Sequence, residues 1–288
     1  MRVPEEAAKI FYPLAETITP YFLGLKIDLK KAGMKTSVQE YLGQGIFLLF
    51  LIFFVGLPLF SFIFAFLFKN FLFGFISSFT FILSSLAIFF LVYLNYPKMR
   101  ISGKSKKIDN QIAFATVHLS TIASSGVPLD KIFEIFSKYS AYGETTEEIS
   151  KIQSDIKMFG LDVNTALERA VDRSPSKNLK ELLWGILSTN LTGSDLGIFL
   201  REKSKSFMAD YRRQIHDFSH QLSLYLQIYL TAVILGAAFF VILTSIVAGI
   251  VGIASSVLEL QFFLIFIFLP AISIIFLYLV KVATPGGE

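Results

Sequence analysis

Two long stretches of this chain contain one charged residue each. The first runs over residues 45–96 with Lys69 inside it, and the second over residues 222–280 with Glu259 inside it. The hydrocarbon core of a bilayer is about 30 Å thick and needs about 20 mainly apolar residues per helix, so each stretch is long enough for two crossings. A content of 54% hydrophobic residues, with 32 Phe, is typical of membrane proteins. The pattern predicts an all-α integral membrane protein with four transmembrane helices in two hairpins.

The polar break inside each stretch predicts where the helices turn. Lys69 and Asn70 divide the first stretch into helices over residues 46–68 and 71–94. The region from Ser255 to Glu259 divides the second into helices over residues 224–254 and 261–280, the first of them longer than one bilayer thickness. We therefore expect an N-terminal segment over residues 1–45, a hairpin over 46–96, a central domain over 97–221, a second hairpin over 222–282 and a tail over 283–288.

Lys and Arg gather on one side of this predicted topology. Positive residues near membrane ends are retained in the cytoplasm, so both termini and the central domain are expected there. Residues 1–40 also contain acidic residues and no compact apolar run, so no cleavable signal peptide is expected. Basic residues that border the central domain are expected to meet anionic lipid headgroups: Lys98, Arg100, Lys104, Lys106, Lys107, Arg212 and Arg213.

The central domain has the apolar spacing of amphipathic helices, with turn residues one helix length apart. A helix over about residues 108–124 ends at Gly126, and Pro128 is expected at the first position of the next helix. Thr145 and Glu148 have the spacing of a capping box. The other predicted helix boundaries are breaks at Gly143 and Gly160, an N-cap at Asp162, a helix start at Ser174 and Pro175, and a helix end at Gly193.

About six short helices result, which predicts a compact bundle because each apolar stripe leaves water only by packing on another. The last helix begins near Asp195, and no helix breaker follows between Phe199 and Leu235. We expect it to continue into the third membrane helix and to convey movement of the bundle to the membrane.

The order of these turns resembles the type II secretion F-domain family, whose members are membrane platforms of secretion systems, pili and archaeal flagella. The matching segments are Ser125-Gly126-Val127-Pro128-Leu129, Phe159-Gly160-Leu161-Asp162 with Ala166-Leu167-Glu168-Arg169-Ala170, Pro175-Ser176-Lys177, Leu182-Leu183-Trp184-Gly185-Ile186 and Gly193-Ser194-Asp195-Leu196. The turn residues of this resemblance are Gly126, Pro128, Gly160, Asp162, Pro175 and Gly193. The segment Lys31-Ala32-Gly33-Met34 is similar to members of the Tad and archaeal branches.

The resemblance implies a scaffold in the cytoplasmic (inner) membrane that contacts a cytoplasmic hexameric ATPase. Such a scaffold helps to convert the movement of the ATPase into insertion or extraction of pilin-like subunits. Many members of the family carry two copies of the helical domain and this sequence shows one, which implies assembly with a second copy or with a paralogous platform subunit.

Basic side chains of the central domain are candidates for docking the ATPase by charge complementarity. They are Arg169, Arg173, Lys177, Lys180, Arg201, Lys203 and Lys205. Acidic residues lie among them, so the alternative interpretation is an ordinary solvated helix face.

Small residues of the third membrane helix are candidates for close helix packing. Ser245, Ala248, Gly249 and Gly252 follow one another at three- and four-residue spacing. Packing within the chain and packing between two copies are both compatible with this pattern.

No constellation in the sequence predicts catalysis, a cofactor or nucleic-acid binding. The chain has no cysteine, and no phosphate loop, zinc motif or nucleophile elbow is recognisable. His216 and His220 share a helix face but lack further metal ligands, and His118 is expected to be a packed helix residue. The alternative function is an oligomeric transporter of small solutes, against which stands the absence of ionisable residues from the central portions of the four predicted membrane helices.

Overall fold

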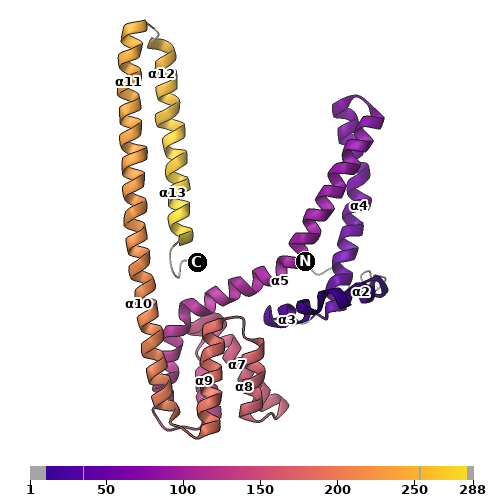
Figure 1. Cartoon of the computed structure of the whole chain (residues 1–288), viewed down its shortest axis with the longest axis vertical. Helices are drawn as coiled ribbons and strands as arrows, with labels where there is room; N and C mark the ends of the chain where they lie inside the picture. The colour runs from indigo at the N-terminus through magenta and orange to yellow at the C-terminus, as the bar shows by residue number, and fades with distance from the viewer. Residues whose placement is uncertain (1–10, 35, 253, 284–288) are drawn as a thin grey trace. The chain divides into compact units, whose positions relative to one another are not determined.

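The computed structural model describes residues 11–34, 36–252 and 254–283, and every regular element in that part is a helix (Figure 1). Four helices are long and apolar enough to cross a membrane: Val38–Phe68, Phe71–Ala123, Leu196–Ile250 and Val257–Lys281. The predicted all-α fold with four membrane-spanning candidates is therefore confirmed, and the chain is a multi-pass membrane protein. Residues 1–200 and residues 201–288 form two compact units, which are described separately.

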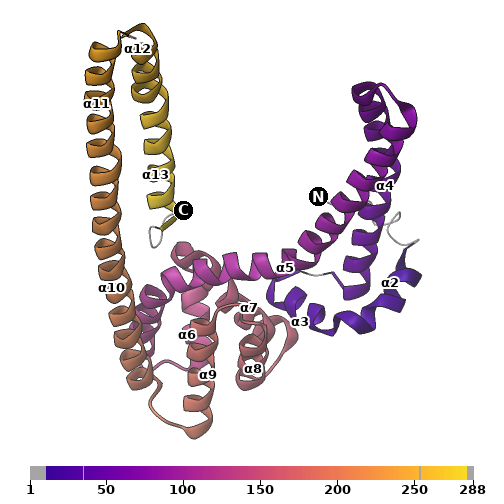
Figure 2. The ribbon, with the colours of Figure 1, turned by 45° about the horizontal axis from the view of Figure 1, so that its top comes forward.

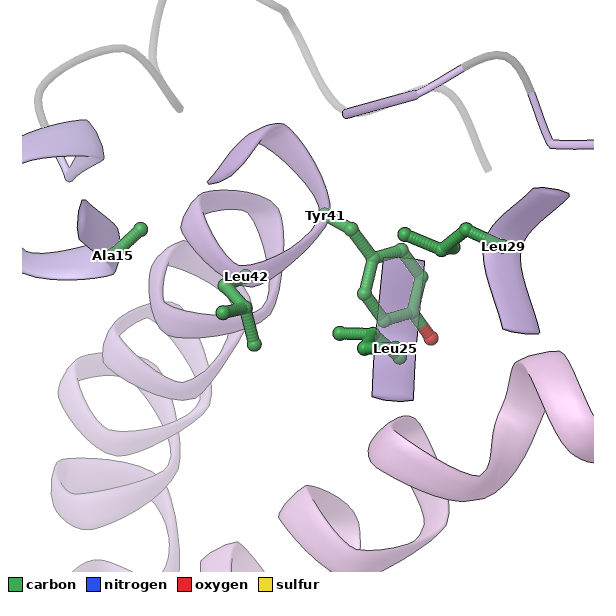
Figure 3. Packing of buried hydrophobic residues seen from close by; sticks show 5 residues of the cluster. All are labelled: Ala15, Leu25, Leu29, Tyr41 and Leu42. Atoms are coloured by element: carbon green, nitrogen blue, oxygen red, sulfur yellow. The ribbon is translucent and has the colours of Figure 1, made fainter. Parts of the chain in front are cut away.

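The first unit begins with short helices that pack beside the start of the first long helix. They are α2 (Tyr12–Ile18), the 3-10 turn η1 (Thr19–Phe22) and α3 (Leu23–Lys31), and they precede α4 (Val38–Phe68). A small apolar cluster joins them, formed by Ala15, Leu25, Leu29, Tyr41 and Leu42 (Figure 3). The N-terminal segment is thus anchored on the membrane hairpin by buried apolar side chains.

Helix α4 begins eight residues before the expected start of the first membrane helix. Ser37 and Glu40 form a capping box, in which Ser37 Oγ accepts from Glu40 N at 3.1 Å and Glu40 Oε2 accepts from Ser37 N at 2.9 Å. This cap satisfies backbone donors at the helix end, so the polar residues before the apolar stretch are helical too. The sequence interpretation looked for the apolar stretch and missed the cap.

Helix α5 (Phe71–Ala123) runs antiparallel to α4 and then continues for 27 residues beyond Tyr96. The turn lies at Lys69, which is left-handed with φ of 51°, and Asn70 Oδ1 accepts from Leu72 N at 3.2 Å. Two tyrosines lock the hairpin reciprocally: Tyr41 OH donates to Tyr93 O at 2.6 Å and Tyr93 OH donates to Tyr41 O at 2.9 Å.

The expectation of separate helices over residues 71–94 and 108–124 was wrong. Pro97 lies inside α5 without ending it. An interior proline removes one backbone hydrogen bond and bends a helix, but a long helix packed at both ends tolerates the loss. The ribbon of α5 does change direction between the hairpin and the bundle (Figure 2).

The bundle is built on the second half of α5. Around it lie α6 (Leu129–Ser137), α7 (Gly143–Phe159), α8 (Val163–Arg173), α9 (Lys177–Thr192) and the first residues of α10 (Leu196–Ile228). Its core contains Ile108, Leu119, Phe133, Phe136, Ile149, Ile152, Leu167, Leu179, Leu182 and Ile186, each at most 2% exposed. These are the apolar positions whose helical spacing the sequence shows.

Three of the expected turn residues have the left-handed backbone that glycine adopts without strain: Gly126 at φ +70°, Gly160 at +63° and Gly193 at +70°. Asp162 is the N-cap of α8 and accepts from Asn164 N at 3.0 Å. The helix starts at the two prolines are displaced, since Pro128 is the N-cap of α6 and Ser176, after Pro175, is the N-cap of α9.

The capping box expected at Thr145 and Glu148 is wrong. Helix α7 already begins at Gly143, and no side chain caps it. Thr146 Oγ1 instead donates to Tyr139 O at 2.9 Å, and Glu148 turns into the bundle. Glycine at 143, with φ of +42°, lets the chain enter the helix directly from the preceding 3-10 turn η2 (Ser140–Tyr142).

In the second unit, α10 passes without a break into the π-helical segment η3 (Tyr229–Leu235) and α11 (Gly236–Val251). The return path consists of α12 (Ala254–Phe263), the π-helical segment η4 (Leu264–Phe268) and α13 (Leu269–Ala283). The turn between them is at Gly252, which has φ of +76° and caps α11, a few residues before the expected position. The left-handed glycine sets the turn, and Ser255 and Ser256 belong to the next helix.

Candidate functional site

A buried carboxylate lies at the centre of the bundle's charged residues. Glu148 on α7 is 5% exposed, and three cations from three helices surround it. Its Oε1 lies 2.7 Å from Lys104 Nζ of α5 and 2.7 Å from Lys151 Nζ of α7, and its Oε2 lies 3.8 Å from Arg173 Nε of α8. We call these residues, with Glu144 and Asp155, the Glu148 network.

The network extends on both sides of Glu148. Lys104 also lies 3.2 Å from Glu144, and Arg173 Nη1 donates to Asp155 Oδ2 at 2.5 Å. Burial by itself raises the pKa of Glu148, but hydrogen bonds and charge from Lys104 and Lys151 outweigh it and hold that pKa below its ordinary value. The carboxylate is therefore ionised at neutral pH and joins the helix that carries the first hairpin to two helices of the bundle.

A second polar cluster fixes the turn at Pro175. Asp109 Oδ1 of α5 accepts from Ser176 Oγ at 2.5 Å and from Asn178 Nδ2 at 3.0 Å, while its Oδ2 accepts from Ser105 Oγ at 3.0 Å. Ser176 Oγ in turn accepts from Leu179 N at 3.1 Å and caps α9. Asp109 thus explains why this turn has a defined place on α5.

We expect Asp109→Ala to lower the free energy of unfolding by about 2–3 kcal/mol, because it leaves the buried Ser176 hydroxyl without its acceptor. Thermal unfolding of the detergent-solubilised chain, followed by circular dichroism, measures this. Asp162→Ala is the control, because it removes only an exposed N-cap worth about 1 kcal/mol. Equal losses in the two variants would contradict a special role for Asp109.

The structure divides the candidate docking residues into different kinds. Arg169, Lys177 and Lys180 are exposed on α8 and α9 of the first unit. Arg173 is not available for docking in the same way, since its side chain is 16% exposed and is held by Asp155 and Glu148. In the second unit, Lys205 pairs with Glu202 at 2.8 Å, Lys203 Nζ lies 4.7 Å from the centre of the Phe207 ring, and Arg201 is exposed.

The expected membrane-surface cations are also not equivalent. Lys98, Arg100, Lys106 and Lys107 are exposed on α5, and Arg212 and Arg213 are exposed on α10. Lys104 differs, because its side chain is 11% exposed and pairs with Glu144 and Glu148. Its assignment to a headgroup contact is therefore corrected to an internal ion pair.

The small residues of the third membrane helix lie in different settings. Ser245 Oγ accepts from Gln261 Nε2 at 2.9 Å, which joins α11 to α12 within the chain. Ala248 is 8% exposed, a Cβ on Gly249 would meet nothing within 4 Å, and Gly252 forms the turn.

None of the three histidines belongs to a cluster of three or more metal-ligating side chains within the described residues. His216 and His220 are exposed on α10. His118 packs in the bundle, with its ring centre 4.7 Å from that of Tyr139 and 5.5 Å from that of Phe136.

Sequence reasoning missed Glu148 and Asp109 as residues that join helices of the bundle. The partners of Asp109 lie 67 and 69 positions away, and Lys104 and Glu148 lie on different helices. Local spacing cannot reveal such pairs. The one available signal was a glutamate among the apolar positions Ile149 and Ile152, on the buried side of α7.

Residues 115–244 match the protein family described as "Type II secretion system (T2SS), protein F". The chain carries a type II secretion system F domain. The match begins inside α5 and ends inside α11, so it includes most of the bundle and most of the first membrane helix of the second unit. Glu148, Arg173 and Ser176 lie inside the F domain, whereas Lys104 and Asp109 precede the match.

Two relatives of the chain come from Methanocaldococcus jannaschii. The uncharacterized protein MJ1286 is 26% identical over 201 residues, which are 67% of this chain and 33% of that protein. The uncharacterized protein MJ0780 is 29% identical over 175 residues, which are 58% of this chain and 48% of that protein. The chain thus covers between a third and a half of the length of these relatives. No solved structure matches it.

Proposed function

We propose that this protein is a membrane platform of a type IV pilus-like, archaeal flagellum or type II secretion machine. In this role it couples a cytoplasmic ATPase to the assembly of pilin-like subunits and has no catalytic activity of its own. The observation that carries the proposal is an F domain whose first and last helices, α5 and α10, are continuous with apolar helices long enough to cross a membrane. The archaeal source of both relatives favours the archaeal form of such a machine.

The proposed orientation places the bundle and both termini in the cytoplasm. Exposed cations on α5 just after its apolar half, and on α10 before its apolar continuation, support this orientation through the preference of positive residues for the cytoplasmic side. The ATPase would then meet the bundle, and pilin-like subunits and a second platform copy or a paralogue would meet the membrane helices.

Three exposed cations of the bundle, Arg169, Lys177 and Lys180, are the best candidates for contact with the ATPase. Reversing Arg169 and Lys177 to Glu should weaken association with the ATPase more than tenfold at low salt and less at high salt, because contacts between exposed charges are screened. Co-purification of the ATPase from gently solubilised native membranes is the measurement.

The matched control for this experiment is reversal of Lys98 and Lys106 to Glu. These residues are also exposed, but they lie on α5 outside α8 and α9. If the charge-reversed and unaltered proteins retain the ATPase equally at every salt concentration, these exposed cations are excluded as its docking surface. Recovery of the chain alone, with neither an ATPase nor a second platform subunit, would count against the platform function itself.

Movement of the bundle should reach the membrane along the uninterrupted helix Leu196–Ile250. Inserting a flexible Gly/Ser linker after Ser219 breaks this helix, so we expect filament assembly or secretion to be lost although the protein still folds. The same linker after Ser125, in the turn between α5 and α6, is the control for insertion as such. Full assembly with the linker after Ser219 would refute the mechanical coupling.

A further inference from the structure

A cavity of about 490 Å³ opens where the N-terminal segment meets the bundle. One wall is the end of α3 at Ala32 and Gly33, a second is the face of α5 from Arg100 to Lys107, and the third is the start of α7. All three walls belong to the first unit. Nothing in the proposed platform function uses this cavity.

Three cations of α5 point to one side of the helix. Arg100, Lys104 and Lys107 follow one another at i, i+4 and i+7, and all three line the cavity. With Lys151 of α7 they make four cations, against the two lining carboxylates Glu144 and Glu147. The lining therefore carries an excess of positive charge and is suited to an anion.

The four cations differ in how far they are already neutralised. Lys104 and Lys151 are bound to Glu148, and Lys104 also to Glu144. Arg100 and Lys107 are exposed, and neither forms an ion pair with any described residue. The Glu148 network thus fixes Lys104 and Lys151 in the cavity lining, and Arg100 and Lys107 remain as donors for a ligand.

Two glycines keep the walls of the cavity free of side chains. Gly103 lies in the middle of α5, where glycine costs about 0.5–1 kcal/mol relative to alanine, yet a Cβ there would meet nothing within 4 Å. Packing therefore does not require this glycine. Gly33 has φ of +68°, and a Cβ built on it would lie 3.8 Å from Lys104 Nζ. The chain reverses at this residue close to the ammonium group.

The cavity begins close to the end of the apolar half of α5. Tyr96 is the last residue of the charge-free stretch, and Arg100 follows it by four residues, about 6 Å along a helix that rises 1.5 Å per residue. Lipid phosphates lie in the polar layer just outside the hydrocarbon core. Basic pockets at this depth bind the head groups of anionic lipids.

We propose that this cavity binds a phosphate group, which the headgroup of an anionic phospholipid supplies. The planar guanidinium of Arg100 presents two parallel N–H donors to the phosphate oxygens, and Lys107 adds a charged donor two turns further along α5. The bound headgroup joins α3, α5 and α7 at the edge of the bilayer. This inference does not depend on the ATPase or on any filament.

The test uses the full chain in nanodiscs of phosphatidylcholine, titrated with short-chain fluorescent phosphatidylglycerol. We expect saturable binding that weakens about tenfold or more in the variant with Arg100→Ala and Lys107→Ala, since both side chains donate charge-assisted hydrogen bonds to the phosphate and not only a surface charge. In the matched control, Lys98→Ala with Lys106→Ala, the same charge is removed from exposed α5 positions outside the cavity. Less than a twofold change is expected there.

A second variant tests the shape of the cavity without changing its charge. Gly103→Leu places a side chain in open space, so it should block the lipid while the thermal unfolding temperature stays within a few degrees of the unaltered protein. In a second experiment, inorganic phosphate is added to the phosphatidylcholine nanodiscs together with the fluorescent phosphatidylglycerol, and displacement of the lipid is measured. Competition by phosphate alone at low concentration, with the same dependence on Arg100 and Lys107, would assign the site to a soluble phosphate compound instead of a lipid.

Equal weakening in the cavity variant and in the Lys98 and Lys106 control would overturn the proposal, because it would reduce the effect to diffuse surface charge. Binding that does not saturate, or that Gly103→Leu leaves intact, would overturn it as well. A defect in filament assembly has no bearing on these measurements, so failure of the platform function and failure of this site are distinguishable.

Discussion

Glu148→Ala should lower the free energy of unfolding by about 3–5 kcal/mol, one of the largest losses expected from any single change in the bundle. The substitution removes the carboxylate that lies between Lys104 and Arg173, so that Lys104 keeps only Glu144 and Arg173 only Asp155 as partners. Removing one member of a buried ion-pair network is costly, because the remaining buried charges are no longer balanced. Thermal and denaturant unfolding of the detergent-solubilised chain measure the loss.

Glu134→Ala is the matched control for this experiment. Glu134 also contacts three lysines, Lys131, Lys138 and Lys157, but their side chains are 55–70% exposed. Its pKa is lowered to about 2, chiefly by the hydrogen bond from Lys131. Solvent screens such pairs, so we expect a much smaller loss than with Glu148→Ala. Similar losses in the two variants would show that the contribution of Glu148 to the free energy of unfolding does not depend on its burial.

The pH dependence of stability provides an independent check on the same residue. The folded pKa of Glu148 is lower than its unfolded value, so its contribution is fully present above the ordinary value of 4.5 and is lost as pH falls through the folded pKa. The unaltered protein should therefore lose stability in acid more steeply than Glu148→Ala. Parallel pH profiles for the two proteins would contradict the ionised, paired state of Glu148.

Gly74→Ala should open the first membrane hairpin near its turn. A Cβ on Gly74 would lie 2.5 Å from Ala65 N and 2.6 Å from Ala65 Cα, so it would collide with the backbone of α4 and the two helices would have to separate. Overpacking of this kind costs about 1–3 kcal/mol or more when side chains cannot give way. The small residue therefore sets the distance between α4 and α5 at this level.

The absence of native cysteines makes the hairpin easy to monitor. Ser78 is fully buried between α4 and α5, with its Oγ 3.4 Å from Leu57 O, so Ser78→Cys reports opening through its rate of alkylation in detergent. We expect faster alkylation when Gly74→Ala is added. Gly56→Ala is the control, because its Cβ would meet Ile82 at an ordinary 3.7 Å. Unchanged alkylation with Gly74→Ala would mean that the hairpin absorbs the methyl group.

The parts of the fold that local chemistry determines could be predicted from the sequence. The turn at Lys69 and Asn70, the glycines at 160 and 193 and the cap at Asp162 depend on residues within a few positions of one another. The continuous α5 was not predictable in the same way, because a proline in a polar stretch ordinarily predicts a helix boundary. Packing at both ends of that helix overrides the local preference.

In the candidate site, too, the residue types could be predicted from the sequence, but their partners could not. Exposure separates Arg169 and Lys177 from Arg173, and it separates Lys98 from Lys104, although the sequence presents each group as one run of cations. The difference comes from the partners Asp155 and Glu148, which are brought near by the fold and not by spacing. The composition of a basic stretch therefore indicates its charge but not which of its members remain available to a partner.

The length of α5 between its two packed regions also restricts how this protein can change during evolution. Tyr93 is fixed on α4, and Asp109 is fixed on the turn before α9, with one uninterrupted helix between them. Each residue added or removed in that interval would rotate everything after it by about 100° and shift it by about 1.5 Å. Single-residue insertions and deletions should therefore be excluded here, whereas changes of three or four residues nearly restore the phase. Variation in length should instead accumulate in the turns at Gly126 and Gly193, where no such phase is imposed.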